Sequence, residues 1–360
     1  MSQRKKIVVL IINCLQGGGA ERSVLSLGQG FYEIGYEVHI IRFKPLVEYD
    51  LNPRLNYHLI KFKPYKLIPS EQLGHKLFAR KLDRYILDNI GQPDIILSNL
   101  QRADNVVAYS SLPNITYIIH NTISLEYKFD TVKNINHVRN KLINTYSRHP
   151  CVCVSDGVKQ DFIESLGNIT PMTTINNPID QHEIKQLATA FIPKYSNYII
   201  HVGSFKKVKH HDVLLKAYAK TDQSLPLLLL GQGKLKSEIE ALITELGLTE
   251  KVFLLGFQKN AYPYMKHAKF KVLTSSQEGL PMVILEALAI GTPVISTDCQ
   301  SGPKEMLPEY NLMPVGDIDA IANKMSQAMQ NSEQFVTVFD ASYLPTQIAQ
   351  KHIDFIKLVS

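Results

Sequence analysis

Short apolar runs rich in Val, Ile and Leu alternate with helical patterns along the whole chain, and this alternation constrains the fold more than any other feature. The first run is Ile7 to Ile12, and glycines and a helical pattern from Glu21 to Ile34 follow it. Short, continuously apolar runs of this kind are typical of strands buried on both faces of a parallel sheet. The alternation therefore predicts an α/β fold built from strand–helix–strand units.

Ten such runs are present, which is too many for one compact sheet of ordinary size. The runs are Ile7–Ile12, Val38–Phe43, Asp94–Ser98, Thr116–His120, Cys151–Ser155, Tyr198–Val202, Leu225–Leu230, Val252–Leu255, Phe270–Thr274 and Val294–Thr297. The turn-forming Asn176-Asn177-Pro178 and Pro193 precede the fresh run at Tyr198. We therefore expect two doubly wound parallel-sheet domains, residues 1–180 and 181–345, followed by a helical segment over 346–360.

The composition excludes several classes of protein. With 45% hydrophobic and 20% charged residues the chain can bury a full core, so a disordered or collagen-like chain is ruled out. Its apolar runs are far shorter than the roughly 18 residues that a membrane-spanning helix needs. The apolar stretch that ends near Cys14 is too short for a secretion signal. Four cysteines form no disulfide framework in a chain this long, so we expect reduced thiols and a cytoplasmic protein.

Positive charge is concentrated in the first half of the chain. Residues 1–180 hold 21 Lys and Arg against 16 Asp and Glu. Eight basic residues, interleaved with aromatic ones, fall within one stretch: Arg54, Lys61, Lys63, Lys66, Lys76, Arg80, Lys81 and Arg84. Such a stretch fits a solvated face, an anionic membrane surface or, least well, a nucleic acid. Our prediction is a peripheral contact with an anionic membrane and no nucleic acid partner.

Two glycine turns between a strand and a helix could admit phosphate groups. The first is Gly17-Gly18-Gly19, and the second is the lysine-rich loop from Gly203 to Lys209. Glycines let backbone amides approach a phosphate at a helix N-terminus, and lysine is a compact cation suited to a diphosphate. The spacing is not G-x-G-x-x-G and no G-x-x-x-x-G-K-[ST] occurs, so dinucleotide dehydrogenases and P-loop NTPases lose support.

Two glutamates eight residues apart form the most informative segment. Glu278 stands in a glycine loop after an apolar run, and Glu286 stands about two turns into the following helical pattern. Two turns span about 11 Å, so the two carboxylates are expected to bind different parts of an elongated ligand. The amides of Gly279 and Leu280, at the expected start of the helix, would serve its phosphates.

At this point the chain resembles the retaining family-4 glycosyltransferases of GT-B fold, of the bacterial surface-polysaccharide type. The resemblance covers nearly the whole chain and is densest from 198 to 310. It rests on the two glutamates, the Gly203–Lys209 loop, Gly231-Gln232-Gly233, Gly256-Phe257 and Ser301-Gly302-Pro303-Lys304-Glu305. It implies two Rossmann-like domains facing across a cleft. The first would hold the acceptor, the second the nucleotide sugar, and segment 346–360 would cross back to the first.

The resemblance also implies roles for individual residues. Glu278 would contact the donor sugar, Lys209 would neutralise the diphosphate, and His120 would lie near the reacting sugar. The residues expected to bind the donor are Gly18, Gly19, Gly203, Ser204, Lys209, Gly231, Glu278, Gly279, Leu280 and Glu286. Ser204 is a departure, because the family usually has arginine there. One diphosphate cation is therefore missing, or is supplied by Lys206 or Lys207.

No metal or other cofactor is expected. The Asp317-Ile318-Asp319 segment follows Gly316 and opens a helical pattern, so we interpret it as a helix cap and not as a metal site. The predicted reaction is transfer of a sugar from a nucleotide sugar, UDP-linked by family frequency, to a lipopolysaccharide, capsule or lipid-linked glycan with an α-linkage. Two alternatives stay open: a non-catalytic protein that binds sugar nucleotides, and a nucleotide-sugar epimerase of similar fold.

Overall fold

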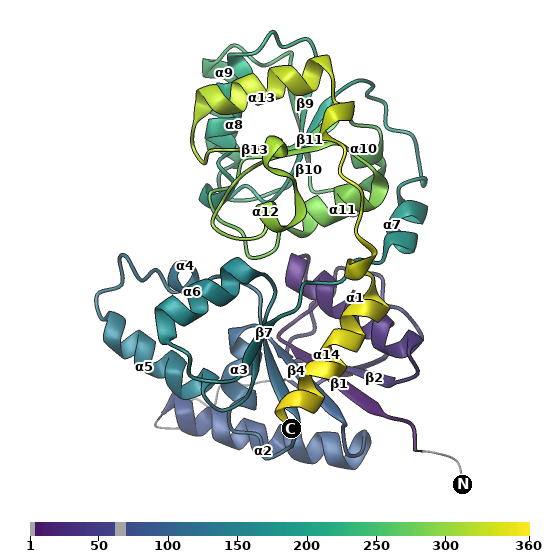
Figure 1. Cartoon of the computed structure of the whole chain (residues 1–360), viewed down its shortest axis with the longest axis vertical. Coiled ribbons are helices and arrows are strands. Elements are labelled where there is room, and N and C mark those ends of the chain that lie inside the picture. The colour runs from purple at the N-terminus through teal and green to yellow at the C-terminus, as the bar shows by residue number, and fades with distance from the viewer. Residues whose placement is uncertain (1–3, 62–69) are drawn as a thin grey trace. The chain divides into compact units, whose positions relative to one another are not determined.

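The computed structural model describes residues 4–61 and 70–360, which divide into two compact units (Figure 1). The first unit runs to Pro178 and also contains Ala341–Ser360, and the second is Ile179–Asp340. The chain thus passes between the units twice, after Pro178 and after Asp340. Because the end of the chain belongs to the first unit, that unit is discontinuous in sequence.

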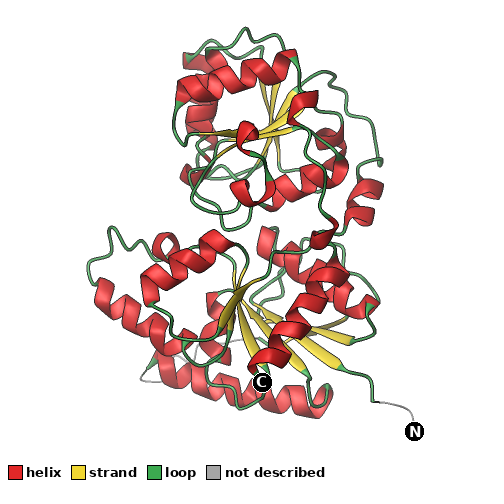
Figure 2. Cartoon of the chain, viewed as in Figure 1, coloured by secondary structure: helices red, strands yellow, loops and turns green. Residues whose placement is uncertain are grey.

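Among the described residues, the first unit contains one seven-stranded sheet in which every pairing is parallel (Figure 2). In spatial order its strands are β3 (Asn56–Leu59), β2 (Glu37–Arg42), β1 (Ile7–Ile12), β4 (Ile95–Asn99), β5 (Ile115–Ile119), β6 (Cys151–Cys153) and β7 (Met172–Thr174). Every residue of the central β1 is buried. A strand buried on both faces needs the continuous apolar run that the sequence supplies.

Helices cover this sheet. They are α1 (Gly19–Glu33), α2 (Glu71–Asn89), α3 (Gln101–Val107), α4 (Ile123–Glu126), α5 (Ile135–Tyr146), α6 (Asp156–Leu166) and, from the end of the chain, α14 (Pro345–Val359), which the short η4 (Ala341–Tyr343) precedes. The terminal α14 packs against α1, where the rings of Phe31 and His352 lie 6.5 Å apart between centroids. Helix α6 begins at Ser155, whose hydroxyl accepts a hydrogen bond from the amide of Val158.

The second unit contains a parallel sheet of six strands within the described part of the chain. Its spatial order is β10 (Val252–Gly256), β9 (Leu227–Leu230), β8 (Ile199–Val202), β11 (Phe270–Leu273), β12 (Val294–Thr297) and β13 (Leu312–Met313). The helical segments are α7 (Gln181–Leu187), η1 (Lys207–Lys209), α8 (His211–Ala219), α9 (Lys236–Glu245), α10 (Tyr262–Lys266), α11 (Met282–Ile290), α12 (Pro303–Met306), η2 (Glu309–Asn311), α13 (Ile318–Gln330) and η3 (Glu333–Phe335). Apolar residues of β8, β9 and β11 pack with α8, α9 and α13 in one core.

Each of the ten predicted runs overlaps a strand of these two sheets, so the predicted α/β class with parallel sheets is confirmed. The predicted helix cap is also confirmed, because the carboxylate of Asp317 accepts a hydrogen bond from the amide of Ala320 at 2.9 Å. Within residues 4–61 and 70–360, no helix is both long enough and apolar enough to cross a membrane.

Candidate functional site

In each sheet the order of the strands reverses between two neighbours, β1 and β4 in the first unit and β8 and β11 in the second. Ligands of doubly wound sheets bind outside the carboxyl ends of the strands at such a reversal. Gly203 and Ser204 follow β8, and Glu278 follows β11. The topology of the second unit therefore brings the predicted donor-binding segments to one end of its sheet.

Two glycines allow the loops after β8 and β9 to meet. Gly231 has a φ of +152°, and a Cβ atom built on it would lie 2.0 Å from the carbonyl oxygen of Gly203. No side chain fits there, and few residues other than glycine adopt that φ. The backbones of Gly203 and Gly231, two of the predicted donor-binding residues, are therefore neighbours in the structure.

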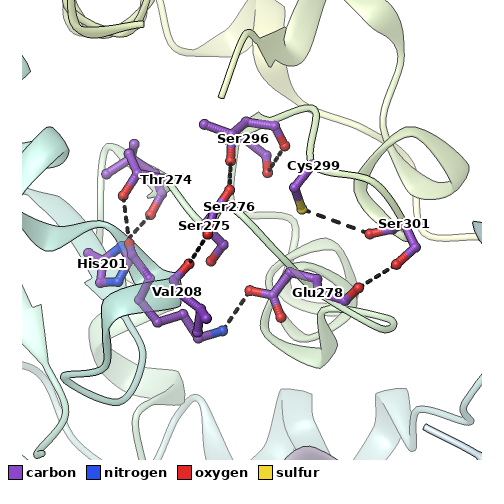
Figure 3. Close-up of polar contacts among 12 residues, drawn as sticks. His201, Val208, Thr274, Ser275, Ser276, Glu278, Ser296, Cys299 and Ser301 are labelled. Atoms are coloured by element: carbon purple, nitrogen blue, oxygen red, sulfur yellow. Dashed lines mark hydrogen bonds and ion pairs between the residues drawn. The ribbon is translucent and has the colours of Figure 1, made fainter. Parts of the chain in front are cut away.

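Lys209 and Glu278 form an ion pair across the same end of the sheet. The Nζ atom of Lys209 lies 2.6 Å from Oε1 of Glu278, and the two side chains are only 17% and 11% exposed. Figure 3 shows the carboxylate of Glu278 directed towards this contact. A charged pair this well shielded interacts much more strongly than a surface pair. The structure thus joins the predicted diphosphate cation to the predicted sugar-binding carboxylate.

Hydrogen bonds fix the loop that carries Glu278 (Figure 3). The amide of Ser276 donates to the carbonyl of Val208 at 2.8 Å, and the hydroxyl of Thr274 donates to the carbonyl of Lys209 at 3.1 Å. On the other side, the hydroxyl of Ser301 donates to the carbonyl of Glu278. Both partners of the ion pair are therefore held through their backbones and not only through each other.

Helix α11 carries the second glutamate. Glu286 is 8% exposed and accepts a hydrogen bond from the hydroxyl of Tyr262 at 3.2 Å. The helix begins at Met282, so Gly279 and Leu280 lie in the loop that leads directly into it. Tyr262 was not predicted, because it stands in α10 and only the folded chain brings it to Glu286.

The position of the missing arginine is occupied by the half-exposed Ser204. Lys206 and Lys207, which were considered as replacements, are exposed. Both line a pocket of about 330 Å³ between η1, α8 and α9 whose wall also includes His210, His211, Asp212, Leu235, Glu238, Ile239 and Leu242. Neither is paired with Glu278, which bonds to Lys209.

The glycine turn of the first unit lies at the N-terminus of α1, and Gly19 is the first residue of that helix. Two of its amides already have partners in this structure. The amide of Gly17 donates to the carboxylate of Glu48 at 2.9 Å, and the amide of Gly18 donates to the hydroxyl oxygen of Tyr49 at 2.8 Å. An anion that used these amides would have to displace Glu48 and Tyr49.

His120 directly follows β5 and is buried. Its Nε2 lies 3.0 Å from Oδ1 of Asn99, whose own amide group donates to the carbonyls of Ile11 and Leu97. Those donations fix Oδ1 as an acceptor, so Nε2 of His120 carries the proton and Nδ1 is left as an acceptor. Burial lowers the pKa of His120 to about 4, so the ring is neutral near pH 7. Its Nδ1 is buried and has no hydrogen-bond partner among the described residues.

A buried cation near the second glutamate also escaped the prediction. Lys271 stands in the middle of β11 and is fully buried. A lysine inside the otherwise apolar run Phe270–Leu273 was the available sequence signal.

Within residues 4–61 and 70–360, no group of three or more His, Cys, Asp or Glu side chains is arranged to hold a metal ion.

Comparison with known families matches the two halves of the chain separately. The family "Glycosyltransferase Family 4" matches residues 17–183, and "Glycosyl transferases group 1" matches residues 183–337. One relative is the N-acetylgalactosamine-N,N'-diacetylbacillosaminyl-diphospho-undecaprenol 4-alpha-N-acetylgalactosaminyltransferase of Campylobacter jejuni. It is 30% identical over 338 residues, which are 89% of this chain and 88% of the relative.

A second relative and a solved structure extend the comparison. The lipopolysaccharide 1,6-galactosyltransferase of Salmonella typhimurium is 25% identical over 215 residues, which cover 56% of this chain and 58% of that enzyme. The structure of HepE from Anabaena in complex with UDP and glucose superimposes with a TM-score of 0.71 at 18% identity, covering 98% of both chains. The family matches, the Campylobacter relative and the two-sheet architecture agree, and the chain belongs to the family-4 glycosyltransferases of GT-B fold.

Proposed function

We propose that this glycosyltransferase is a retaining enzyme that transfers a sugar from a UDP-sugar to a lipid-linked, lipopolysaccharide or capsule glycan and forms an α-glycosidic bond. The observation that carries the proposal is the shielded pair of Lys209 and Glu278 at the carboxyl ends of β8 and β11. It supplies a cation for a diphosphate and a carboxylate for sugar hydroxyls within one hydrogen bond of each other.

In the proposed mechanism, different parts of the donor bind different charged groups of the second unit. Leaving of the nucleoside diphosphate builds negative charge on its phosphate oxygens, and a lysine directed at those oxygens stabilises that charge. In this proposal Lys209 moves its hydrogen bond from Glu278 to the diphosphate. Glu278 then accepts hydrogen bonds from the sugar, and Glu286 accepts them from the ribose hydroxyls.

We propose that His120, in the first unit, acts on the reacting sugar. Its neutral ring offers Nδ1 as an acceptor, and Asn99 fixes the orientation of the ring. Such a group can orient a hydroxyl of the reacting sugar, and good orientation of the reactants lowers the barrier substantially. We expect no metal in this reaction, so transfer should persist in EDTA.

Relatives support the class of acceptor. The name of the Campylobacter enzyme describes addition of N-acetylgalactosamine to a diphospho-undecaprenol glycan, and the Salmonella enzyme acts on lipopolysaccharide. We propose an acceptor of the same class for this chain, a growing glycan attached to a lipid. The donor sugar would then be a hexose or an N-acetylhexosamine.

A thermal-shift experiment tests the donor assignment. UDP and UDP-sugars should raise the melting temperature of the protein by mass action, and Glu286→Ala should remove that rise. Glu245→Ala, which changes an exposed glutamate in α9, is the matched control and should keep it. A folded protein whose melting temperature does not respond to UDP, GDP, ADP or their sugar conjugates would contradict the assignment.

Product analysis tests the reaction. With a UDP-sugar and a short undecaprenyl-diphosphate-linked glycan, we expect a product longer by one sugar, with the anomeric proton coupling of an α-linkage in its NMR spectrum. Conversion of the UDP-sugar in the absence of any acceptor would favour an epimerase. Tight UDP binding without any product would favour a protein that only binds sugar nucleotides.

We also propose that the enzyme works as a peripheral protein at the inner face of the cytoplasmic membrane, through the outer face of α2. The exposed residues of α2 include three leucines and four cations: Leu73, Leu77, Leu87, Lys76, Arg80, Lys81 and Arg84. Arg54 and Lys61 are exposed nearby in the sequence, whereas Lys63 and Lys66 lie outside the described residues. Cations beside apolar side chains are the combination that binds anionic bilayers.

Vesicle binding tests this surface. The protein should sediment with vesicles that contain phosphatidylglycerol and remain in solution with phosphatidylcholine vesicles. Changing the four cations of α2 to glutamine should abolish sedimentation. Changing four exposed lysines of the second unit, Lys194, Lys216, Lys234 and Lys266, should not. Equal losses in the two variants would mean that net charge, and not α2, drives binding.

A further inference from the structure

Lys271 occupies a place where a lysine is seldom tolerated. It lies at the centre of β11, in register with Ile200 of β8 on one side and Val294 of β12 on the other. It is 0% exposed, and its Nζ atom has no hydrogen-bond partner within the described part of the structure. Burying an ammonium group without a partner is costly unless other charges offset it.

The opposite charge that acts most strongly on Lys271 is the carboxylate of Glu286. Phe270 and Val272 point into the core formed with α8, α9 and α13. Side chains alternate along a strand, so Lys271 points to the other face of the sheet. Glu286 is itself almost fully buried and is held by the hydroxyl of Tyr262.

The charged groups around Lys271 act on its protonation in opposite directions. The carboxylates of Glu286 and Glu278 favour its charged form, and the cation of Lys209 opposes it. The neighbouring His201 is neutral, because burial holds its pKa well below the ordinary value. Two lysines and two carboxylates therefore act on one another around β11 before any ligand arrives.

Donor binding would change these interactions. If Lys209 turns to a diphosphate, Glu278 loses the only ion-pair partner that the described structure gives it. We propose that Lys271 is a positioning residue of the donor site, a buried cation that keeps Glu286 and Glu278 charge-balanced while Lys209 is engaged with the diphosphate. The inference rests on the proposed donor site. It gives Lys271 a role through the two carboxylates and not through contact with the ligand.

This role predicts a dependence of donor affinity on pH. Burial lowers the pKa of Lys271 to about 7, so the lysine loses its proton near neutral pH. An anionic ligand binds better when the lysine is charged. Affinity for UDP should therefore be highest below pH 7 and should fall as the pH rises towards 9.

Isothermal titration with UDP at pH 6, 7, 8 and 9 tests the inference in the whole protein. The variants are Lys271→Met, which removes the charge and keeps the length, and Lys271→Arg, which keeps the charge at every pH. Leu273→Met is the control for repacking, because Leu273 is buried on the same strand and, two residues away, on the same face. Taking the ratio of each variant's Kd to that of the unchanged protein cancels the titration of UDP itself.

We expect Lys271→Met to weaken UDP binding about tenfold at pH 6 and hardly at all at pH 9. Lys271→Arg should bind as tightly as the unchanged protein at pH 6 and more tightly at pH 9. Leu273→Met should give a ratio near one throughout. A ratio near one for Lys271→Met at every pH, while Glu286→Ala still abolishes binding, would overturn this inference alone. Normal UDP binding by Glu286→Ala would instead overturn the proposed donor site.

Thermal unfolding separates a folding defect from a binding defect. Burial of a charged lysine opposes folding fully below pH 7, and that opposition is relieved as the pH rises from 7 towards the ordinary lysine pKa of 10.5. Lys271→Met should therefore raise the melting temperature, and more at pH 6 than at pH 9. A purely structural lysine would change the melting temperature without changing the Kd ratio.

Discussion

The reversal between β1 and β4 in the first unit and the reversal between β8 and β11 in the second present different kinds of polar group. In the first unit, His120 is neutral, and the amides of Gly17 and Gly18 are already hydrogen-bonded. In the second, Lys209 and Glu278 form a shielded ion pair, with the buried Lys271 and Glu286 close by.

Under the proposed function, this difference suits the two units to two kinds of ligand. Neutral acceptors with fixed orientation suit hydroxyl groups, which carry no charge. Opposed charges in a shielded place suit a diphosphate, which brings negative charge with it and can exchange one ion pair for another. The contrast therefore predicts that charge-removing substitutions affect donor use in the second unit far more than in the first.

The largest expected effect comes from Lys209→Met. It removes the proposed diphosphate cation and leaves the carboxylate of Glu278 shielded and unpaired. We expect kcat/KM for the UDP-sugar to fall about 1,000-fold, which corresponds to about 4 kcal/mol. Steady-state kinetics at fixed acceptor concentration measure it. Lys207→Met, which changes an exposed lysine two residues away, should stay within about threefold; equal losses would show that the loop needs only general positive charge.

The next largest effect is expected from substitution of a glycine, which would lower the stability of the fold by disturbing backbone packing. Gly231→Ala places a Cβ atom 2.0 Å from a carbonyl oxygen at an unfavourable φ. We expect it to lower the free energy of unfolding by about 3 kcal/mol. Gly18→Ala meets only the far end of the Glu21 side chain, and its φ of −153° suits any residue. It should cost less than about 1 kcal/mol in the same urea titration; a larger cost than that of Gly231→Ala would reverse the comparison.

A smaller effect is expected from acid, through His120. Its folded pKa of about 4 lies below the ordinary value of 6.5, so the unfolded chain binds more protons between those values and stability falls as the pH falls through that range. The loss from His120 between pH 6.5 and pH 5 is about 2 kcal/mol. His120→Gln should show a correspondingly shallower decline in urea titrations at these two pH values. The exposed His137→Gln should leave the decline unchanged.

Most of the fold could be predicted because buried strands require continuous apolar runs. The strands that were missed, β3, β7 and β13, all lie at sheet edges. Tyr57, Thr173 and Leu312 at these edges are only half-buried, so no continuous apolar run was needed there. Edge strands are therefore identified from their pairing in the folded chain more readily than from the sequence pattern.

The site was harder to predict than the fold, because its contacts join distant segments. Lys209 and Glu278 could be named, but their contact spans 69 positions and depends on two loops folding together. Tyr262 and Asn99 belong to no recognisable sequence motif. Their importance lies in the hydrogen bonds that orient Glu286 and His120. Lys271 was visible as a charge in an apolar run, yet its relation to Glu286 arises from the side-chain alternation of β11.

The return of the chain to the first unit has a consequence for the order of synthesis. Residues 341–360 are made after the whole of the second unit, and they include α14, which packs against α1. Until they leave the ribosome, Gly30 and Phe31 of α1 lack Pro345 and His352 of the helix that packs against them. The second unit, continuous in sequence, can fold before the first unit is complete, although most of the first unit is synthesised earlier. A chain that stalls before residue 341 would thus expose apolar surface in the first unit and not in the second.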